Sequence, residues 1–470
     1  MNASFAEHVT DQAVAFVESL QFTDIPEEAV HLATRCVLDT MGLYLAGTTE
    51  HSVQILADQA LDQGGKQEAS LLGSDNQRVP AGLAARVLGT AGHAHDWDDT
   101  QVSHDPDHLY GLLTHPSVPP LTAAIVIAQK VGNVDGQTLL TAFLAGFEVE
   151  CKISEWMKPD HYRRGHHTSG NVGTFGAAVA AAKILGLTGD SLRHAIGMAA
   201  SFSAGIRCNF GTMTKPLHVG RAAENGVTAA LLAQRGFTAD PTALDGQWGY
   251  MQVMGNGFSP DKVKDGFANP LTILSPGVSI KPYPSGILTH QSMDAMLKLV
   301  TDHDVKPEDV ERITFFAGSN ILEPIRYEVA KNHLQAKFSM AGLLAMMVIY
   351  RQAGRQEFTD ECVGSAAMQD MQRRITTELD PEIENAGFDR IRSRIELTIH
   401  DGTTYTQWAD ERYRGGPDMP MSDAEVGEKF RACTNGLISA ERQAAIIEGV
   451  LGIATLKDTA VIADWLSTKD

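Results

Sequence analysis

The sequence predicts a mainly α-helical protein in which a smaller α+β domain separates a long helical part from a helical tail. A chain of 470 residues is too long for one ordinary hydrophobic core, so two or more domains are expected. Helical patterns and Ala-rich runs dominate up to Asn269-Pro270, and strand-like patterns begin only beyond it. We therefore divide the chain into a helical part at 1–270, an α+β domain at 271–410 and a tail at 411–470.

Helix signals recur along the first part. Residues 23–28 combine cap candidates, an early proline and first-turn acids, and apolar residues between 30 and 45 then follow near-helical spacing. Residues 139–156 and 175–187 carry further helical patterns. The run 176–182 contains only Gly, Ala and Val, whose small side chains allow helices to approach closely. We expect this helix at the centre of a bundle.

Strand and turn signals define the middle domain. Val310 to Ala317 has strand-like composition, Arg394 to His400 alternates apolar and polar residues, and Asp401-Gly402 is a good hairpin turn. A loop-rich zone at 415–420 gives way to Ser422-Asp423-Ala424-Glu425, a capping-box pattern that opens another helix. Periodicity alone leaves open whether this helical tail rejoins the first domain.

Composition excludes several classes of partner. The formal net charge of −20 argues against nucleic acid, because phosphate binding needs a basic face. The five cysteines lie far apart, without zinc or iron–sulfur spacing, which fits a reducing cytoplasm. The N-terminus lacks signal-peptide features, and the longest apolar run, Met340 to Tyr350, is too short to cross a bilayer. We expect a cytoplasmic protein with no membrane partner.

The stretch Gly92 to Thr100 holds the densest set of titratable groups. It contains two histidines, three carboxylates and a hydroxyl, and Thr114-His115-Pro116-Ser117 follows it. An acid/base site is one interpretation, because adjacent carboxylates and imidazoles shift each other's pKa values. A polar, Asx-rich loop that caps a helix is the other. From this stretch alone both interpretations stay open.

Three further segments carry chemically useful residues. Residues 165–170 (GHHTSG) precede the Ala-rich helix and would present an imidazole near its N-terminus. Residues 211–221 group three basic side chains, and residues 281–285 (KPYPS) begin the middle domain. Taken singly, His167 is more often a core or surface histidine and Lys215 more often a surface charge, although Pro216 argues for a fixed loop.

Taken together, the order of these segments resembles the MmgE/PrpD family, which includes 2-methylcitrate dehydratase, cis-aconitate decarboxylase and iminodisuccinate epimerase. The resemblance runs from Cys36 to Lys429-Phe430 through the segments HDWDDT, THPS, GHHTSG, TMTKPLHVGRAA, KPYPS and AKFS. It implies a helical domain completed by the C-terminal segment, an inserted α+β lid, a homodimer, and no metal or organic cofactor.

The resemblance also implies a set of site residues in a pocket between the helical domain and the lid. The residues that it assigns to catalysis are Asp96, Thr100, His115, His167 and Lys215. We expect Lys281, Arg207 and Tyr283 to bind the substrate, a small anionic carboxylate.

Two departures from the decarboxylase pattern bear on the reaction. Decarboxylase members of the family resemble one another in a tyrosine where this chain has Met340, and in a histidine where it has Gly286. The connection from Thr100 to His115 is also long; its titratable residues are His104, Asp105, Asp107, His108 and Tyr110. The substrate end of the pocket is therefore expected to differ from those of the named family members.

Removal of a proton α to a carboxylate needs a base within hydrogen-bond reach and cations that stabilise the developing enediolate. Lys215, Lys281 and Arg207 are candidate cations, and His115 or His167 is the candidate acid for a leaving hydroxyl. We predict a cofactor-independent carboxylate lyase, foremost a hydro-lyase of the 2-methylcitrate dehydratase type. A two-base isomerase or epimerase, a decarboxylase, and a helical dimer that only binds a metabolite are the alternatives, in that order.

A metal site is a tempting interpretation of the same stretch. His93, His95, Asp96, Asp98, Asp99 and His104 are all potential ligands. We predict that no metal is required, because lysines in the pocket would repel a divalent ion and supply the same electrophilic stabilisation.

Overall fold

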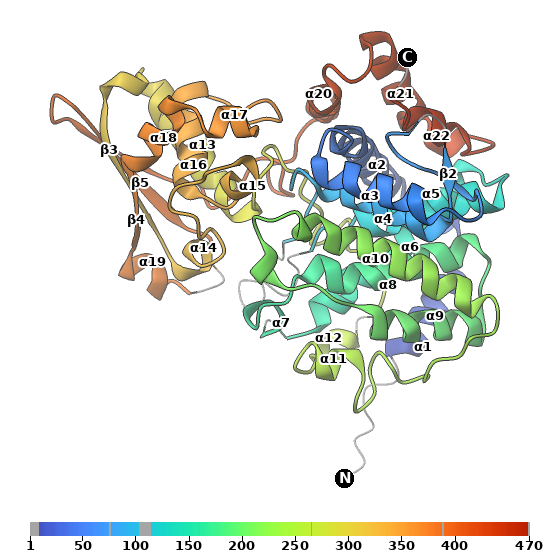
Figure 1. The fold of residues 1–470 in the computed structure, drawn as a ribbon. Coiled ribbons are helices and arrows are strands. Elements are labelled where there is room, and N and C mark those ends of the chain that lie inside the picture. The colour runs from blue at the N-terminus through green and yellow to red at the C-terminus, as the bar shows by residue number, and fades with distance from the viewer. Residues whose placement is uncertain are drawn as a thin grey trace.

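The computed structural model describes residues 9–74, 77–102, 114–158, 160–264, 266–387 and 390–468. Its ribbon has a large helical lobe and a smaller lobe built around a β-sheet (Figure 1). The titratable residues predicted in the connection after Thr100, from His104 to Tyr110, lie outside the described residues.

Helix α8 (Thr168–Ile184) is the centre of the helical lobe, as its small side chains predict. It packs against four neighbours and begins before the predicted position 175, because Thr168 and Ser169 lie buried in the same packing. Those neighbours are α5 (Val118–Val131), α6 (Gly136–Trp156), α9 (Gly189–Phe202) and α10 (Thr214–Ala233).

Helix α10 also packs closely against α4 (Ala81–His93), and a glycine makes this contact possible. A Cβ added at Gly220 would lie 2.3 Å from the Arg86 carbonyl oxygen and 2.1 Å from Thr90 Oγ1. This close approach matters for the site, because α4 ends at His93 and α10 carries Lys215 in its first turn.

The C-terminal tail packs on the N-terminal helix α2 (Glu27–Gly47). Figure 1 shows the tail at the top of the helical lobe. The capping box predicted at Ser422 opens α20 (Asp423–Thr434), and Phe430 of α20 contacts Gly42 of α2. The tail continues as α21 (Ala440–Leu451), η6 (Ile453–Thr455) and α22 (Val461–Trp465). The predicted fold class is therefore confirmed, whereas the boundary positions 270 and 410 remain predictions.

Short elements complete the helical lobe. They are α1 (Val9–Ser19), η1 (Phe22–Asp24), α3 (His51–Gln63), β1 (Ala69–Ser70), β2 (Arg78–Val79), α7 (Asp160–Arg163), η3 (Arg207–Asn209), α11 (Tyr250–Val253) and α12 (Pro260–Val263).

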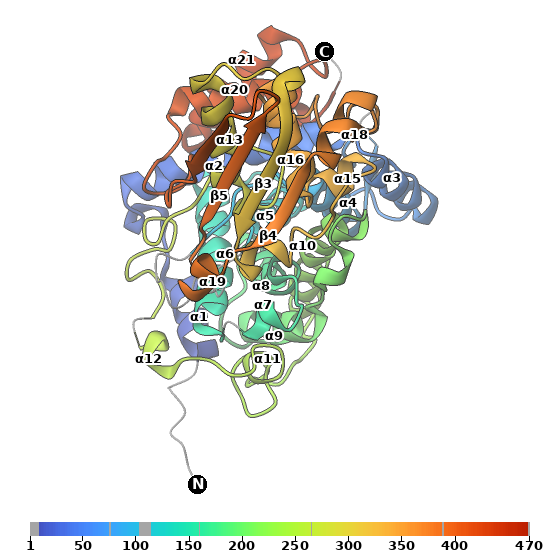
Figure 2. The same cartoon turned by 90° about the vertical axis from the view of Figure 1, so that its left-hand side faces the viewer.

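The smaller lobe, called the lid here (residues 283–408), contains a four-stranded sheet in the order β4-β3-β5-β6. Strand β3 (Val310–Ala317) pairs in parallel with β4 (Ile375–Leu379) and antiparallel with β5 (Ser393–Ile399), which forms the predicted hairpin with β6 (Thr404–Trp408). Figure 2 shows the strands in front and α13 and α16 behind them. The apolar side chains of β3 that face these helices are buried.

The described helices and 3₁₀ turns of the lid are η4 (Ile287–Thr289), α13 (His290–Asp302), η5 (Pro307–Asp309), α14 (Ser319–Leu322), α15 (His333–Ala336), α16 (Met340–Tyr350), α17 (Asp360–Val363), α18 (Ala366–Arg373) and α19 (Pro381–Asn385). In the described parts of the chain, none of the helices has the length and apolarity needed to cross a membrane.

Candidate active site

A small cavity lies between the helical lobe and the lid, and its two walls differ in chemistry. The helical wall is rich in polar and aromatic groups: Asp96, His115, Tyr162, His167, Ser169, Phe210 and Lys215. The described lid wall is apolar: Gly286, Ile287, Leu288, Pro324, Ile325 and Phe338. The centre of a water molecule can reach about 40 Å³ of it, which is room for a few waters. Counting the part open to solvent, the space between the two walls is about 460 Å³.

Asp96 occupies a tight turn directly after α4. Its backbone N–H donates to the His93 carbonyl oxygen at 3.1 Å, and its φ of 53° lies in the left-handed region. Asp tolerates this region better than most residues with a side chain. The chain then leaves the turn as an extended segment, and Thr100 pairs with Ser279 across the junction of the two lobes.

The carboxylate of Asp96 is the centre of the buried charges. Its Oδ1 accepts from Lys281 Nζ at 2.8 Å, and it lies 3.2 Å from Lys215 Nζ and 3.8 Å from His115 Nε2. Burial alone would raise the pKa of Asp96, but the two ammonium groups hold it well below its usual range. Asp96 is therefore an ionised anchor for cations rather than a base of ordinary strength.

Three buried lysines hold the backbone of this turn. Lys337 donates to the Ala94 carbonyl at 2.8 Å, Lys281 to the Asp96 carbonyl at 2.8 Å, and Lys429 to the Trp97 carbonyl at 2.7 Å. Lys281 and Lys337 come from the chain leading into and through the lid, and Lys429 comes from α20. The lysines of the KPYPS and AKFS segments thus stabilise the turn by donating hydrogen bonds to its backbone carbonyl groups.

His93 positions Lys215. Its Nδ1 lies 2.8 Å from Asp98 Oδ2, an acceptor, so Nδ1 carries the proton and Nε2 accepts from Lys215 Nζ at 2.8 Å. Burial lowers the pKa of His93 to about 3, despite the carboxylate of Asp98. Neutral His93 and ionised Asp96 take up two of the three ammonium N–H groups of Lys215. Within the described part of the chain, the third N–H has no protein acceptor and is available to a ligand in the cavity.

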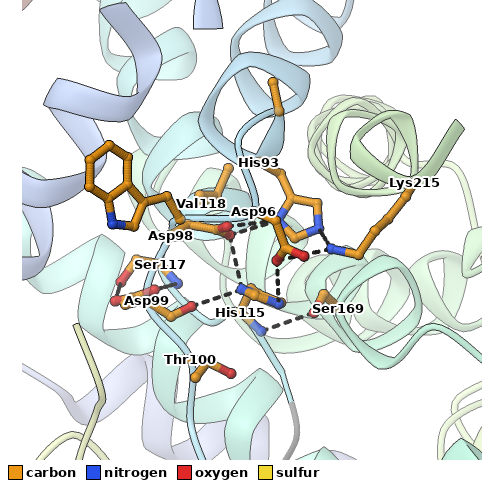
Figure 3. A network of polar contacts seen from close by, with 12 residues as sticks. His93, Asp96, Asp98, Asp99, Thr100, His115, Ser117, Val118, Ser169 and Lys215 are labelled. Atoms are coloured by element: carbon orange, nitrogen blue, oxygen red, sulfur yellow. Dashed lines mark hydrogen bonds and ion pairs between the residues drawn. The ribbon is translucent and has the colours of Figure 1, made fainter. Parts of the chain in front are cut away.

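His115 is arranged as a base. Its Nδ1 lies 3.0 Å from the Asp99 carbonyl and 3.2 Å from Asp98 Oδ2 (Figure 3). Both partners only accept hydrogen bonds, so Nδ1 carries the proton and Nε2 keeps its lone pair. The backbone N–H of His115 donates to Ser169 Oγ, which fixes the ring relative to α8. Whenever the ring is neutral, this tautomer leaves the Nε2 lone pair for proton abstraction, at 3.8 Å from Asp96 Oδ1.

His167 lies at the N-terminal cap of α8, as predicted. Its Nδ1 is 3.0 Å from Nδ1 of His218, so one of these two rings donates to the other. Burial lowers the pKa of His167 well below its usual value, and the nearby Lys215 adds to this effect. Neutral His167 forms the second imidazole on the helical wall.

Asp99 belongs to the support of the site. Ser117 donates to its carboxylate through both the backbone N–H and the hydroxyl group (Figure 3). Burial raises the pKa of Asp99 to about 7, and the neighbouring carboxylates of Asp39 and Asp98 act in the same direction. Asp99 is therefore partly protonated near neutral pH and carries less charge than its two neighbours in the motif.

Four of the eight residues expected at the site line the cavity: Asp96, His115, His167 and Lys215. The other four do not. Lys281 is fully buried, and its three N–H groups go to Asp96 and the Ser285 carbonyl, so none is left for a substrate. Thr100 Oγ1 donates to the Thr114 carbonyl.

Arg207 and Tyr283 also lie away from the described cavity lining. The Arg207 guanidinium covers the outer face of Tyr162, 4.1 Å from its ring centroid, and Tyr283 donates to Asp294 at 2.6 Å. The structure adds His93, Asp98 and Lys337, for which the only sequence signal was their place inside the HDWDDT and AKFS segments or next to them.

The described residues offer one candidate metal cluster, and it fits a metal poorly. Ligand atoms of His93, Asp96, Asp98 and His115 lie within 4.8 Å of one another. Lys215 already donates to His93 Nε2 and contacts Asp96, which also binds Lys281. A divalent ion would have to displace two ammonium groups, so these residues favour cationic side chains over a metal. Of the other potential ligands named from the sequence, His95 and Asp99 are outside this cluster and His104 is outside the described residues.

Comparisons with known proteins cover nearly the whole chain. The family model of the MmgE/PrpD N-terminal domain matches residues 11–262, and that of the MmgE/PrpD C-terminal domain matches residues 283–453. Cis-aconitate decarboxylase of Homo sapiens is 28% identical over 468 residues, which is 97% of this chain and 94% of that protein. The mouse protein of the same name is 26% identical over 97% of this chain and 93% of its own length. That of Aspergillus terreus is 24% identical over 98% and 96%, respectively.

Proposed function

This chain belongs to the MmgE/PrpD family, and from that premise we propose that it is a cofactor-independent lyase acting on a small di- or tricarboxylate. The foremost reaction is a hydro-lyase reaction of the 2-methylcitrate dehydratase type. The observation that carries this proposal is the helical wall, where the His115 imidazole and the Lys215 ammonium line the same cavity.

In the proposed mechanism His115 Nε2 takes the proton from the carbon next to a carboxylate. Lys215 donates to that carboxylate and stabilises the negative charge as it becomes an enediolate. The imidazolium of His115 formed in this step then protonates the leaving hydroxyl, while neutral His167 contacts the substrate from the same wall. A C–H and a C–O bond break, a C=C bond forms, water leaves, and His115 returns to its neutral form. Asp96 favours the protonated form of Lys215, and Asp96 and His93 together orient its ammonium group.

The alternative of a two-base epimerase is less well supported. Such a reaction needs a proton donor and a proton acceptor on opposite faces of the carbanion. Among the described residues all titratable groups lie on the helical wall, and the lid wall from Gly286 to Phe338 offers none. This one-sided arrangement suits an elimination in which both groups act from the same face.

Decarboxylation is the second candidate, because the relatives of this chain include cis-aconitate decarboxylases. An apolar lid wall would also disfavour a substrate carboxylate placed against it, which would favour its loss as CO₂. The two departures from the decarboxylase pattern speak against decarboxylation. Gly286 lines the cavity where a histidine is expected, and Met340 is buried at the start of α16 where a tyrosine is expected.

The test is proton and carbon NMR in D₂O with 2-methylcitrate, citrate and cis-aconitate as substrates. Loss of the hydroxyl-bearing carbon signal with growth of an alkene supports the hydro-lyase. Release of CO₂ from cis-aconitate would instead identify a decarboxylase. Exchange of the α-proton without elimination would instead identify an epimerase. Binding without any exchange would leave a metabolite-binding protein. The homodimer implied by the family is proposed alongside and is checked by sedimentation.

A further inference from the structure

A second hollow lies where Trp97, the lid and the end of α20 meet. It shares no lining residue with the catalytic cavity, and the centre of a water molecule can reach about 410 Å³ of it. We call it the arginine groove; the lining residues used below are Trp97, Tyr283, Arg351, Arg355, Glu357 and Arg414. Tyr283 of the KPYPS segment lines this groove and is absent from the described lining of the catalytic cavity.

The groove concentrates positive charge in a protein whose net charge is −20. Three guanidinium groups line it, against one carboxylate among its described lining residues, that of Glu357. Glu357 accepts from Gln352 Nε2 at 2.7 Å and from the Gly354 N–H at 2.8 Å. These donors are neutral, so Glu357 is satisfied without pairing with an arginine. Guanidinium groups therefore outnumber carboxylates by two among the described lining residues, while Asp304 and Asp294 lie outside the lining beside Arg351 and Arg414.

The three arginine side chains each have protein contacts that orient them, and these contacts use only some of their N–H donors. Arg355 donates to the Asn435 carbonyl of the tail, and Arg351 donates to the Val305 carbonyl at 3.2 Å and lies 3.5 Å from Asp304. Arg414 lies over the Tyr283 ring at 5.3 Å, with Asp294 3.9 Å away. A guanidinium has five N–H donors in a planar fork that matches phosphate and carboxylate groups. These contacts orient the arginines without using up that capacity.

We propose that the arginine groove binds a compact polyanion, a metabolite with at least two phosphate or carboxylate groups. Three guanidinium groups line one hollow whose volume accommodates such a molecule, and each keeps N–H donors that an anion would satisfy. The groove is independent of the proposed reaction, because its lining residues differ from those of the catalytic cavity.

Trp97 gives the site a built-in probe. It lies between Asp96 and Asp98 in the chain, is 3% exposed, and its ring is 5.4 Å from Lys429 Nζ. A polyanion bound in the groove places negative charge beside this indole and should change its fluorescence. The substitution W97F assigns the signal among the five tryptophans of the chain.

The experiment is isothermal titration calorimetry on the full chain with pyrophosphate and, separately, tricarballylate. We expect pyrophosphate to bind once per chain, and R355Q and R414Q each to weaken that binding about tenfold through loss of charge-assisted hydrogen bonds. The control R392Q alters an exposed lid arginine that pairs with Glu411 and should bind as the wild type does. Binding of pyrophosphate alone identifies a phosphate ligand, and equal binding of both probes identifies recognition by charge.

Absence of binding up to about 10 mM pyrophosphate and tricarballylate would overturn the proposal. Binding that R355Q and R414Q both leave unchanged would overturn it as well, since the probe would then lie elsewhere, for example in the catalytic cavity. Arg414 is 39% exposed in its side chain, so R414Q tests the groove even if R355Q, which loses its bond to the tail, is unstable.

Discussion

Replacing Lys215 with methionine tests the cation that faces the cavity. Lys215 is the one ammonium among the described lining residues, and it is held by His93 Nε2 at 2.8 Å and Asp96 Oδ1 at 3.2 Å. Loss of one preorganised donor to a developing oxyanion typically costs about 2.7–4 kcal/mol of transition-state stabilisation, which is about 10²–10³-fold in rate. We expect K215M to lose that much in kcat on the true substrate.

The stability of K215M should change less than its activity. Burial lowers the pKa of Lys215, so folding disfavours its charged form, and Asp96 keeps Lys281 at 2.8 Å when Lys215 is removed. K215M nevertheless leaves His93 Nε2 without its donor, so we expect the melting temperature to fall by a few degrees. K337M should lower the melting temperature by several degrees, because the buried Ala94 carbonyl loses its donor.

The assays are substrate turnover by NMR and thermal unfolding, with K183M as the control. Lys183 lies at the far end of α8 and donates to backbone carbonyls of α1 and the residue after it, so its loss should leave turnover unchanged. The wild type should also lose activity at alkaline pH, as the ammonium deprotonates through a pKa that burial has lowered. Near-normal turnover of K215M, or a drop in activity that merely follows its melting temperature, would refute the role of Lys215.

Four further outcomes are expected. H167A should lose about 10²–10⁴-fold in turnover with little change in melting temperature, and normal turnover would remove His167 from the mechanism. G220A should cost about 1–3 kcal/mol or more and lower activity, since its Cβ would lie 2.3 Å from a backbone oxygen of α4. The control is G427A, whose Cβ would lie at an ordinary contact distance of 3.6 Å from Arg431 Nη1; this substitution should leave thermal unfolding unchanged or slightly raise its midpoint. Exhaustive dialysis against EDTA should leave full activity, whereas loss that only a divalent metal restores would contradict the mechanism. The protonated form of Asp99 is favoured by folding, so its stabilising contribution is present at low pH and is lost as pH rises through about 7; the difference in melting temperature between wild type and D99N should therefore change in favour of D99N over that range, and a constant difference would show that Asp99 does not titrate there.

Much of the architecture follows from short-range patterns, which explains why it was predictable. The alternation at Arg394 to His400 and the Asp401-Gly402 turn are local features, and they form the β5–β6 hairpin. The capping box at Ser422 is equally local. For the site, the resemblance brought together Asp96, His115, His167 and Lys215, which do meet at one cavity.

The direction of each buried lysine could not be predicted. Lys281 and Lys215 both contact Asp96, but only the three-dimensional path of the chain decides which of them faces the cavity. The same holds for Tyr283, whose motif neighbours Lys281, yet whose ring lines the arginine groove. His93 was visible in the sequence, but its role depends on Lys215 lying 2.8 Å from it, a contact between residues 122 positions apart.

The positions of the lysines also couple the chemistry to the docking of the lid. Lys281 and Lys337 bind the turn that carries Asp96, and both belong to the chain that forms the lid and its approach. With the lid docked, Asp96 shares its charge between Lys281 and Lys215, so one N–H of Lys215 is left for a substrate. Loss of Lys281 would leave the buried Asp96 carboxylate with Lys215 as its one remaining ammonium partner among the described residues. The apolar lid wall lies across the same cavity, and exclusion of water there strengthens the interaction of a single ammonium group with a developing enediolate.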